Sequence, residues 1–169
     1  MLLTTADAKG ALKIPAASSA DDTAVGEVLA AAQAQVEKVT GPLAPTMVTD
    51  DVVVSWNGST ALTTTPVLSL ATVASVPAGS TVDVSTLTVT AAGVLTGLPP
   101  GLWRVTYQAG WVTVPAEIRE AVIEELTRLW NNRRGPGRRV GGPDSEVVMA
   151  GASERVEALL EGYDTAGFA

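Results

Sequence analysis

The chain has 169 residues with 11 basic and 18 acidic side chains, so its formal net charge is −7. It contains no cysteine and no histidine, which excludes a disulfide framework, a thiol nucleophile, a Ser-His-Asp triad and any metal site that uses Cys or His ligands. The acidic balance argues against a dedicated nucleic-acid-binding protein, which normally presents a basic face. The length suits one domain, with or without an insertion.

The opening residues, MLLTTADAKG, lack the basic start and apolar core of a secretory signal. Mean hydropathy is positive, at +0.26, but the longest uncharged run, between Asp51 and Asp83, is interrupted by an Asn-Gly pair and by two prolines. No run reaches the roughly 18 apolar residues that a membrane span requires. We therefore expect a soluble protein made in a cytoplasm, with no membrane partner.

Charged residues are concentrated toward the two ends of the chain, and only four of them fall within residues 41–110. That middle zone is rich in Val, Thr and Ser, a composition typical of strands. We expect an α+β protein in three parts: N-terminal helices in residues 1–44, an inserted antiparallel β module in 45–110, and a long helix, a Gly/Arg loop and a C-terminal segment in 111–169.

Two helices are expected before the β module. A short one begins at Thr4 or Thr5 and stops before the first proline. An amphipathic helix near 22–40 follows, with Asp21 or Asp22 as its N-cap. It presents one apolar face, made of Val25, Leu29, Ala32, Val36 and Val39.

The β module is expected to be a small antiparallel sandwich or barrel. Residues 52–56 run into Asn57-Gly58, the strongest short hairpin signal, and the next strand follows at once. Residues 67–76 form another strand. Residues 81–90 alternate in two phases, which predicts a bulge or turn near Ser85-Thr86.

The last strand of the module, 102–110, alternates cleanly and turns Trp103, Val105, Tyr107 and Ala109 to one face. Trp103, Tyr107 and Trp111 form either a core stripe or a sugar-binding strip. Alternating aromatic residues on a strand more often face a core, so the core reading is favoured.

A second long amphipathic helix is expected near 115–134, because Pro115 suits a first helical position and an apolar stripe follows. The stripe consists of Ile118, Val122, Leu126 and Leu129. Glu124 and Arg128 are spaced as an i,i+4 ion pair. After a Gly/Arg loop, residues 146–150 are expected to form a short strand and residues 152–163 a final helix.

No catalytic, cofactor-binding or metal-binding set emerges from the sequence. Adjacent acids such as Asp21-Asp22 and Asp50-Asp51 point in different directions on a helix or strand and do not match a calcium loop. Trp130 lies off the main stripe of its helix and is expected to be an exposed interface anchor. The basic run is either a solvated loop or a contact with an acidic partner or with phosphate, and it consists of Arg133, Arg134, Arg138 and Arg139.

Two stretches resemble the head-to-tail adaptor (connector) proteins of long-tailed bacteriophages. The first is TTADAKGALKI followed by SSADDTAVGEVLAAAQAQVEKVTGP, an amphipathic helix that ends near Thr-Gly. The second is VTYQAGWVTVPAEIREAVIEELTRLWNNRR, in which a strand ends in Tyr-x-Ala-Gly, a Pro-led helix follows, and the helix ends in arginines. The resemblance covers about 1–43 and 103–134, and the β segment between them departs from the minimal helical pattern as an insertion.

The resemblance implies a virion protein that forms a homo-oligomeric ring, usually twelve-fold, under the portal protein and that is assembled in the bacterial cytoplasm. It implies a second partner, a stopper or tail-completion protein, and genomic DNA passing through the lumen without sequence-specific binding. It also implies portal contact through about 146–169, with Tyr163 and Phe168 as anchors. The alternatives are a stopper or tail-completion protein of the neck, or a β module that binds glycans.

A further hypothesis concerns order before assembly. The helix near 115–134 is expected to pack on the helix near 22–40, while the Gly/Arg loop and the C-terminus become ordered only when the ring assembles.

Overall fold

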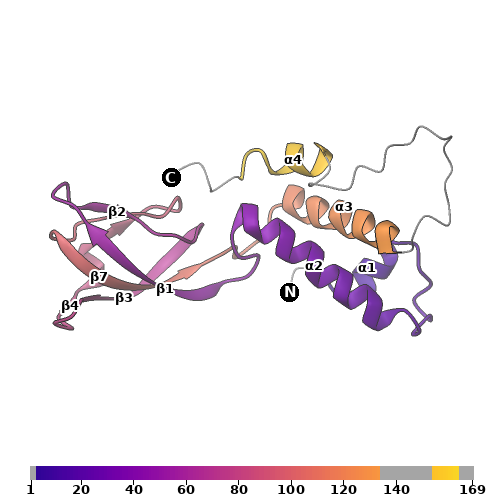
Figure 1. Ribbon diagram of the computed structural model, residues 1–169, viewed down its shortest axis with the longest axis horizontal. Helices are drawn as coiled ribbons and strands as arrows, with labels where there is room; N and C mark the ends of the chain where they lie inside the picture. The colour runs from indigo at the N-terminus through magenta and orange to yellow at the C-terminus, as the bar shows by residue number, and fades with distance from the viewer. Residues whose placement is uncertain (1–2, 134–153, 164–169) are drawn as a thin grey trace. The chain divides into compact units, whose positions relative to one another are not determined.

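The computed structural model describes residues 3–133 and 154–163 (Figure 1). The chain divides into two compact units. The first contains the described residues of 1–36 and 115–164 and is helical, and the second contains residues 37–114 and holds every described strand. The expected α+β class is confirmed. None of the described helices combines the length and the apolarity needed to cross a bilayer.

The helical unit begins with α1 (Thr5–Ala11), and Thr4 is its N-cap. The Thr4 hydroxyl accepts from the backbone N–H of Asp7, and the Asp7 carboxylate accepts from the backbone N–H of Thr4, which completes a capping box. These hydrogen bonds lower the pKa of Asp7. Lys9 is buried, and its ammonium donates to the Ser18 carbonyl and forms an ion pair with Asp22, so the loop between the first two helices is fixed at both ends.

The two long helices are α2 (Asp22–Thr40), whose last turn belongs to the second unit, and α3 (Ala116–Arg133). The predicted apolar faces are confirmed at all but two positions, since Val39 and Leu129 are only half-buried. The expected pairing of Glu124 with Arg128 is wrong. Arg128 instead binds Glu125, whose carboxylate is 1% exposed, through two hydrogen bonds of 2.8 and 2.5 Å.

Helix α4 (Glu154–Leu160) packs against α3, and its Val156 and Leu160 are buried. Burying two aliphatic side chains of this size stabilises the docked helix by about 1.5–3 kcal/mol each. The predicted final helix is therefore present, with narrower bounds than expected. The predicted strand at 146–150 lies outside the described residues.

The β unit contains two antiparallel sheets, one with the order β1-β7-β3-β4 and one with the order β2-β6-β5. β7 is the centre of the larger sheet and pairs with β1 over nine residues. The strands are β1 (Thr46–Val54), β2 (Ser59–Ala61), β3 (Val67–Ser75), β4 (Thr81–Val82), β5 (Thr88–Val89), β6 (Val94–Thr96) and β7 (Gly101–Ala109).

The hairpin predicted at Asn57-Gly58 is wrong in its pairing, although the turn itself is present. The Gly58 N–H donates to the Ser55 carbonyl at 3.0 Å, and Gly58 has a φ of 68°. β1 nevertheless pairs with β7, and β2 pairs with β6 in the other sheet. The turn thus sends the chain from one sheet to the other, and the two sheets enclose a core. The phase change predicted near Ser85-Thr86 is a short 3-10 helix, η1 (Val84–Thr86).

The core of this unit is built on the inner face of β7. Its four predicted inward residues are all buried, and Val105, Tyr107 and Ala109 have no exposed surface at all. They pack in one cluster with Val52, Val54, Leu62, Val67, Val73, Leu95 and Leu98. Successive side chains of β7 point alternately toward and away from the core between the two sheets, which is why its inner face could be predicted from the sequence.

Candidate interaction surfaces

Of the seven predicted interface residues, three lie within the described chain and are separated in it. Trp130 and Arg133 are in the last turns of α3, and Tyr163 follows α4. The other four, Arg134, Arg138, Arg139 and Phe168, lie outside the described residues, as does most of the predicted portal-docking segment.

The expectation that Trp130 is exposed is wrong, because its side chain is only 5% exposed. It follows Leu126 by four residues and continues a stripe that already runs from Ile118 to Val122 in steps of four. The prediction continued the stripe from Leu126 to Leu129, three residues on, instead of to Trp130, four residues on. Spacings of three and of four residues both keep side chains on one face of a helix. Trp130 therefore belongs to the buried side of α3.

Arg133 is half-exposed and links the end of α3 to the start of α2. Its Nη1 lies 2.8 Å from Glu27 Oε2 and 3.5 Å from the Ala24 carbonyl oxygen. Both side chains of the ion pair retain about half of their surface, so the pair contributes at most about 1 kcal/mol. The first arginine of the predicted basic run thus has a contact within its own unit.

Tyr163 and Arg155 lie on a row of acids along α3. The Tyr163 hydroxyl donates to Glu117 at 3.3 Å, and Arg155 lies 2.8 Å from Glu120 and 3.3 Å from Glu124. Desolvation, and then the Glu117 carboxylate, raise the pKa of Tyr163. The hydrogen bond from Arg155 to Glu120 and the charge of Glu124 raise the pKa of Arg155. These contacts hold the α4 region against α3.

The possible sugar-binding strip is not exposed. Trp103 is 7% exposed and donates its indole N–H to the Pro99 carbonyl at 2.9 Å, and Tyr107 is fully buried. Trp111 is half-buried and donates its indole N–H to the Thr40 carbonyl at 3.1 Å. The structure therefore supports the core reading of these aromatic residues.

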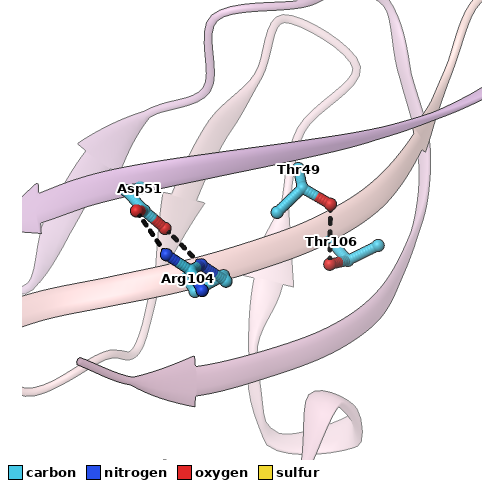
Figure 2. Close-up of polar contacts among 4 residues, drawn as sticks. All are labelled: Thr49, Asp51, Arg104 and Thr106. Carbon is cyan, nitrogen blue, oxygen red and sulfur yellow. Dashed lines mark hydrogen bonds and ion pairs between the residues drawn. The ribbon is translucent and has the colours of Figure 1, made fainter. Parts of the chain in front are cut away.

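The outer face of the larger sheet carries paired polar side chains across β1 and β7 (Figure 2). Arg104 donates two hydrogen bonds to Asp51, at 2.7 and 2.8 Å, and the hydroxyls of Thr49 and Thr106 are 3.0 Å apart. The bonds from Arg104 lower the pKa of Asp51. The members of each pair are direct register partners, and side chains of directly opposed residues on one face of an antiparallel pair lie close enough to interact.

An exposed apolar patch adjoins these pairs at the end of β1 and was not predicted from the sequence. Val53 and Leu102 are register partners and are 70% and 41% exposed. Trp56 is 93% exposed, in the turn two residues after β1 ends. We call Val53, Trp56 and Leu102 the distal patch, because they lie toward the end of the β1–β7 pairing that is opposite to Thr46 and Ala109. The Asn-Gly signal had placed Trp56 beside a turn, but only the sheet pairing shows which strand faces turn outward.

A polar network on the inner side of the same strands fixes the loop after β2. The Tyr107 hydroxyl donates to Asp50 at 2.7 Å and accepts from the Thr64 N–H at 3.0 Å. Asp50 also accepts from the backbone and the hydroxyl of Thr63, at 2.9 and 2.8 Å. Burial, and then the bond to Asp50, raise the pKa of Tyr107. The phenol is thus a structural donor rather than a reactive group.

Residues of the two stretches that resemble adaptor proteins meet at one point of the β unit, which we call the junction. A Cβ on Gly41 would lie 1.7 Å from the Thr65 carbonyl oxygen, and a Cβ on Gly110 would lie 2.4 Å from the Ala44 carbonyl oxygen. The Gly110 N–H donates to the Pro66 carbonyl at 2.8 Å. Glycine is needed at both positions because backbone segments approach too closely for a side chain.

A pocket of about 490 Å³ lies beside the junction. Its lining contains one acidic and one basic side chain and is otherwise small and polar, consisting of Glu37, Lys38, Gly41, Pro42, Thr46, Thr63, Thr64 and Thr65. Two of these residues, Thr63 and Thr64, already serve the Asp50–Tyr107 network. Within the described ranges, no group of three or more acidic residues is placed to hold a metal ion.

Comparison with known proteins shows a likeness in fold. No protein-family model and no curated protein matches the chain. A chain from the neck of an empty gene transfer agent (GTA) particle, computed with C6 symmetry, has a similar fold, with a TM-score of 0.65 and 20% sequence identity. The likeness covers 96% of this chain and 89% of that chain. At this level of identity it establishes the fold.

Proposed function

We propose that the chain is a non-enzymatic structural protein that forms a ring in the neck of a phage-like particle. The observation that carries the proposal is the likeness to the GTA neck chain, because it extends over nearly the whole of both chains. A match to one common module alone would carry far less weight, since a shared fold by itself does not imply a shared function.

Within the neck, we assign the protein to the adaptor position, directly on the portal. Support comes from the junction, where Gly41 and Gly110 of the two adaptor-like motifs lie against carbonyl groups of the same β unit. Both glycines are therefore required for the same reason, which is the close approach of another backbone segment. A stopper or tail-completion role in the same neck is the alternative.

The number of copies follows from symmetry only in part. The GTA neck structure was computed with C6 symmetry. Six-fold symmetry is obeyed by a ring of six copies and equally by a ring of twelve. We propose twelve, because the adaptor resemblance implies that number. In a ring of either size, identical chains would meet through heterologous contacts.

The acidic charge of the chain fits a ring that surrounds DNA without holding it. With a net charge of −7, the ring repels phosphate groups overall, and repulsion reduces retention of the passing genome. DNA is therefore proposed to traverse the lumen without sequence-specific contacts.

The test is assembly with the portal protein encoded by the same genome. Purified chain and portal are mixed, and native mass spectra record the stoichiometry. We expect one portal ring to bind one complete ring of twelve copies of this chain, and a ring of six copies would contradict the proposed number.

Two results would contradict parts of the proposal. A folded protein that binds the tail components but not the portal would replace the adaptor assignment by the stopper or tail-completion role. A protein that stays monomeric with portal and with tail components would overturn the neck function itself.

A further inference from the structure

The side chains of the distal patch are exposed to a degree that is unusual for a surface in contact with water alone. Trp56 is 93% exposed, although tryptophan is one of the most buried residue types on average. Val53 and Leu102 lie directly opposite each other, so their side chains form one continuous apolar surface. Tryptophan is also enriched among residues that dominate protein–protein binding.

The surroundings of the distal patch carry little net charge. Asp51 and Arg104, which lie next to the patch on the same sheet face, have opposite charges and bind each other through two hydrogen bonds. Residues 41–110 contain only two more charged residues, and one of them, Asp50, accepts from Tyr107 and Thr63. Depletion of charge around exposed aromatic and aliphatic residues is typical of the core of an interface.

The strand that carries the patch has an open side. Among the described strands, β1 is at the edge of its sheet and has β7 as its one backbone partner. Near its end, the Val53 carbonyl accepts a side-chain hydrogen bond at 3.3 Å from Thr60 of β2, a strand whose own backbone pairs with β6. β1 also lacks lysine and proline, two residues by which edge strands are commonly protected from pairing with another chain.

We propose that the distal patch is the contact between neighbouring copies of this chain in the ring. The inference rests on the proposed function and names the surface that builds the ring. The occupant is the charge-poor β unit of the next copy.

Charge matching selects that occupant. An uncharged patch has no positive charge to attract phosphate groups and no charge pattern that would select a strongly charged protein. All but four of the charged residues of this chain lie outside 41–110, so the surface that matches the patch in lacking charge is the β unit itself. A ring of identical chains requires such a contact between copies.

The test compares the same substitution at two equally exposed valines. Val53→Asp places a carboxylate in the distal patch. Val112→Asp is the matched control, because Val112 is 78% exposed in the same unit but follows the other end of β7. The two ends of the β1–β7 pairing, Thr46 and Val54, are eight residues and thus about 27 Å apart at roughly 3.4 Å per residue. Circular dichroism verifies that both variants fold.

We expect Val53→Asp to raise the concentration at which rings form by at least about tenfold, as native mass spectra measure it, and Val112→Asp to leave it unchanged. Position 55 gives an independent readout that leaves Trp56 in place. Because the chain has no cysteine, Ser55→Cys at this exposed position provides a single site for a benzophenone maleimide. Irradiation of assembled rings should then crosslink neighbouring copies, whereas Val112→Cys should not.

Failure of this inference differs from failure of the proposed function. The distal patch is overturned as the contact between copies by any of three results. Val53→Asp leaves the rings intact, Val112→Asp disrupts them equally, or the label at position 55 crosslinks only to portal or tail proteins. Wild-type protein that forms no ring, even with portal, overturns both.

Discussion

Gly110 lies so close to Ala44 that a Cβ at position 110 would meet the Ala44 carbonyl oxygen at 2.4 Å. The φ of Gly110, 117°, is also one that side-chain-bearing residues rarely adopt. Close approach and backbone angle thus require glycine at the point where β7 ends. The Tyr-x-Ala-Gly pattern that suggested an adaptor has its physical basis here.

Gly110→Ala is therefore expected to destabilise the protein by at least about 2 kcal/mol, because it combines backbone strain with a clash against a backbone that side-chain rotation cannot relieve. Gly26→Ala, inside α2, is the control, since a Cβ there meets nothing within 4 Å. That change should stabilise by about 0.5–1 kcal/mol. Urea unfolding measures the free energy of unfolding of both variants. A Gly110→Ala variant as stable as the wild type would contradict the requirement for glycine at the junction.

The Tyr107 hydroxyl should matter more than the Tyr163 hydroxyl. Tyr107→Phe leaves the Thr64 N–H and the Asp50 carboxylate each without one partner in a largely buried setting, so a loss of about 1–3 kcal/mol is expected. Tyr163→Phe removes an exposed contact of 3.3 Å and should change stability by less than about 0.5 kcal/mol. Equal effects in thermal unfolding would argue against the Asp50–Tyr107 network.

The Asp51–Arg104 pair gives a dependence on pH with a defined sign. Because its pKa is lowered in the folded state, Asp51 contributes stability above its unfolded pKa of about 3.9, and this contribution is lost as pH falls through the folded value. NMR titration should find the Asp51 midpoint below its usual range, and Arg104→Gln should raise it toward that range. An Asp51 midpoint that Arg104→Gln leaves in place would contradict the pairing.

The two tryptophans at positions 130 and 56 should respond oppositely to truncation. Trp130→Ala removes a buried side chain and should cost about 3–5 kcal/mol of stability. Trp56→Ala removes an exposed one and should stay within about 0.5 kcal/mol, while weakening ring assembly. Denaturant unfolding of the unassembled protein separates the two effects. A costly Trp56→Ala would show that the distal patch is part of the fold.

Helix α4 should be protected before any partner is added. Val156 and Leu160 are buried and Arg155 binds two acids of α3, so amides near the end of α4 should exchange slowly in the free protein. This expectation replaces, for residues 154–160, the hypothesis that the C-terminus becomes ordered only on assembly. Val156→Ser should increase the exchange of α4 alone, whereas protection that is absent in the wild type would contradict the docked helix.

The sequence by itself determined the elements and most of their buried faces. The periods of 3.6 and 2 residues select inward positions on helices and strands, which is why the stripe from Ile118 to Leu126 and the inner face of β7 were predictable. It also determined that catalysis by His or Cys is excluded, because a missing residue type requires no structure to detect. The motif glycines were visible as a pattern, without a reason for their presence.

Only the tertiary structure decided the pairings between elements. The turn at Asn57-Gly58 is local, but whether β1 pairs with β2 or with β7 depends on contacts about fifty residues apart. The same holds for Arg128, which has acids at both i−4 and i−3 and binds the buried one. Trp130 is buried although it was expected to be exposed, and the exposure of Trp56 was not predicted at all, since exposure depends on what packs against a residue and not on its place in a pattern.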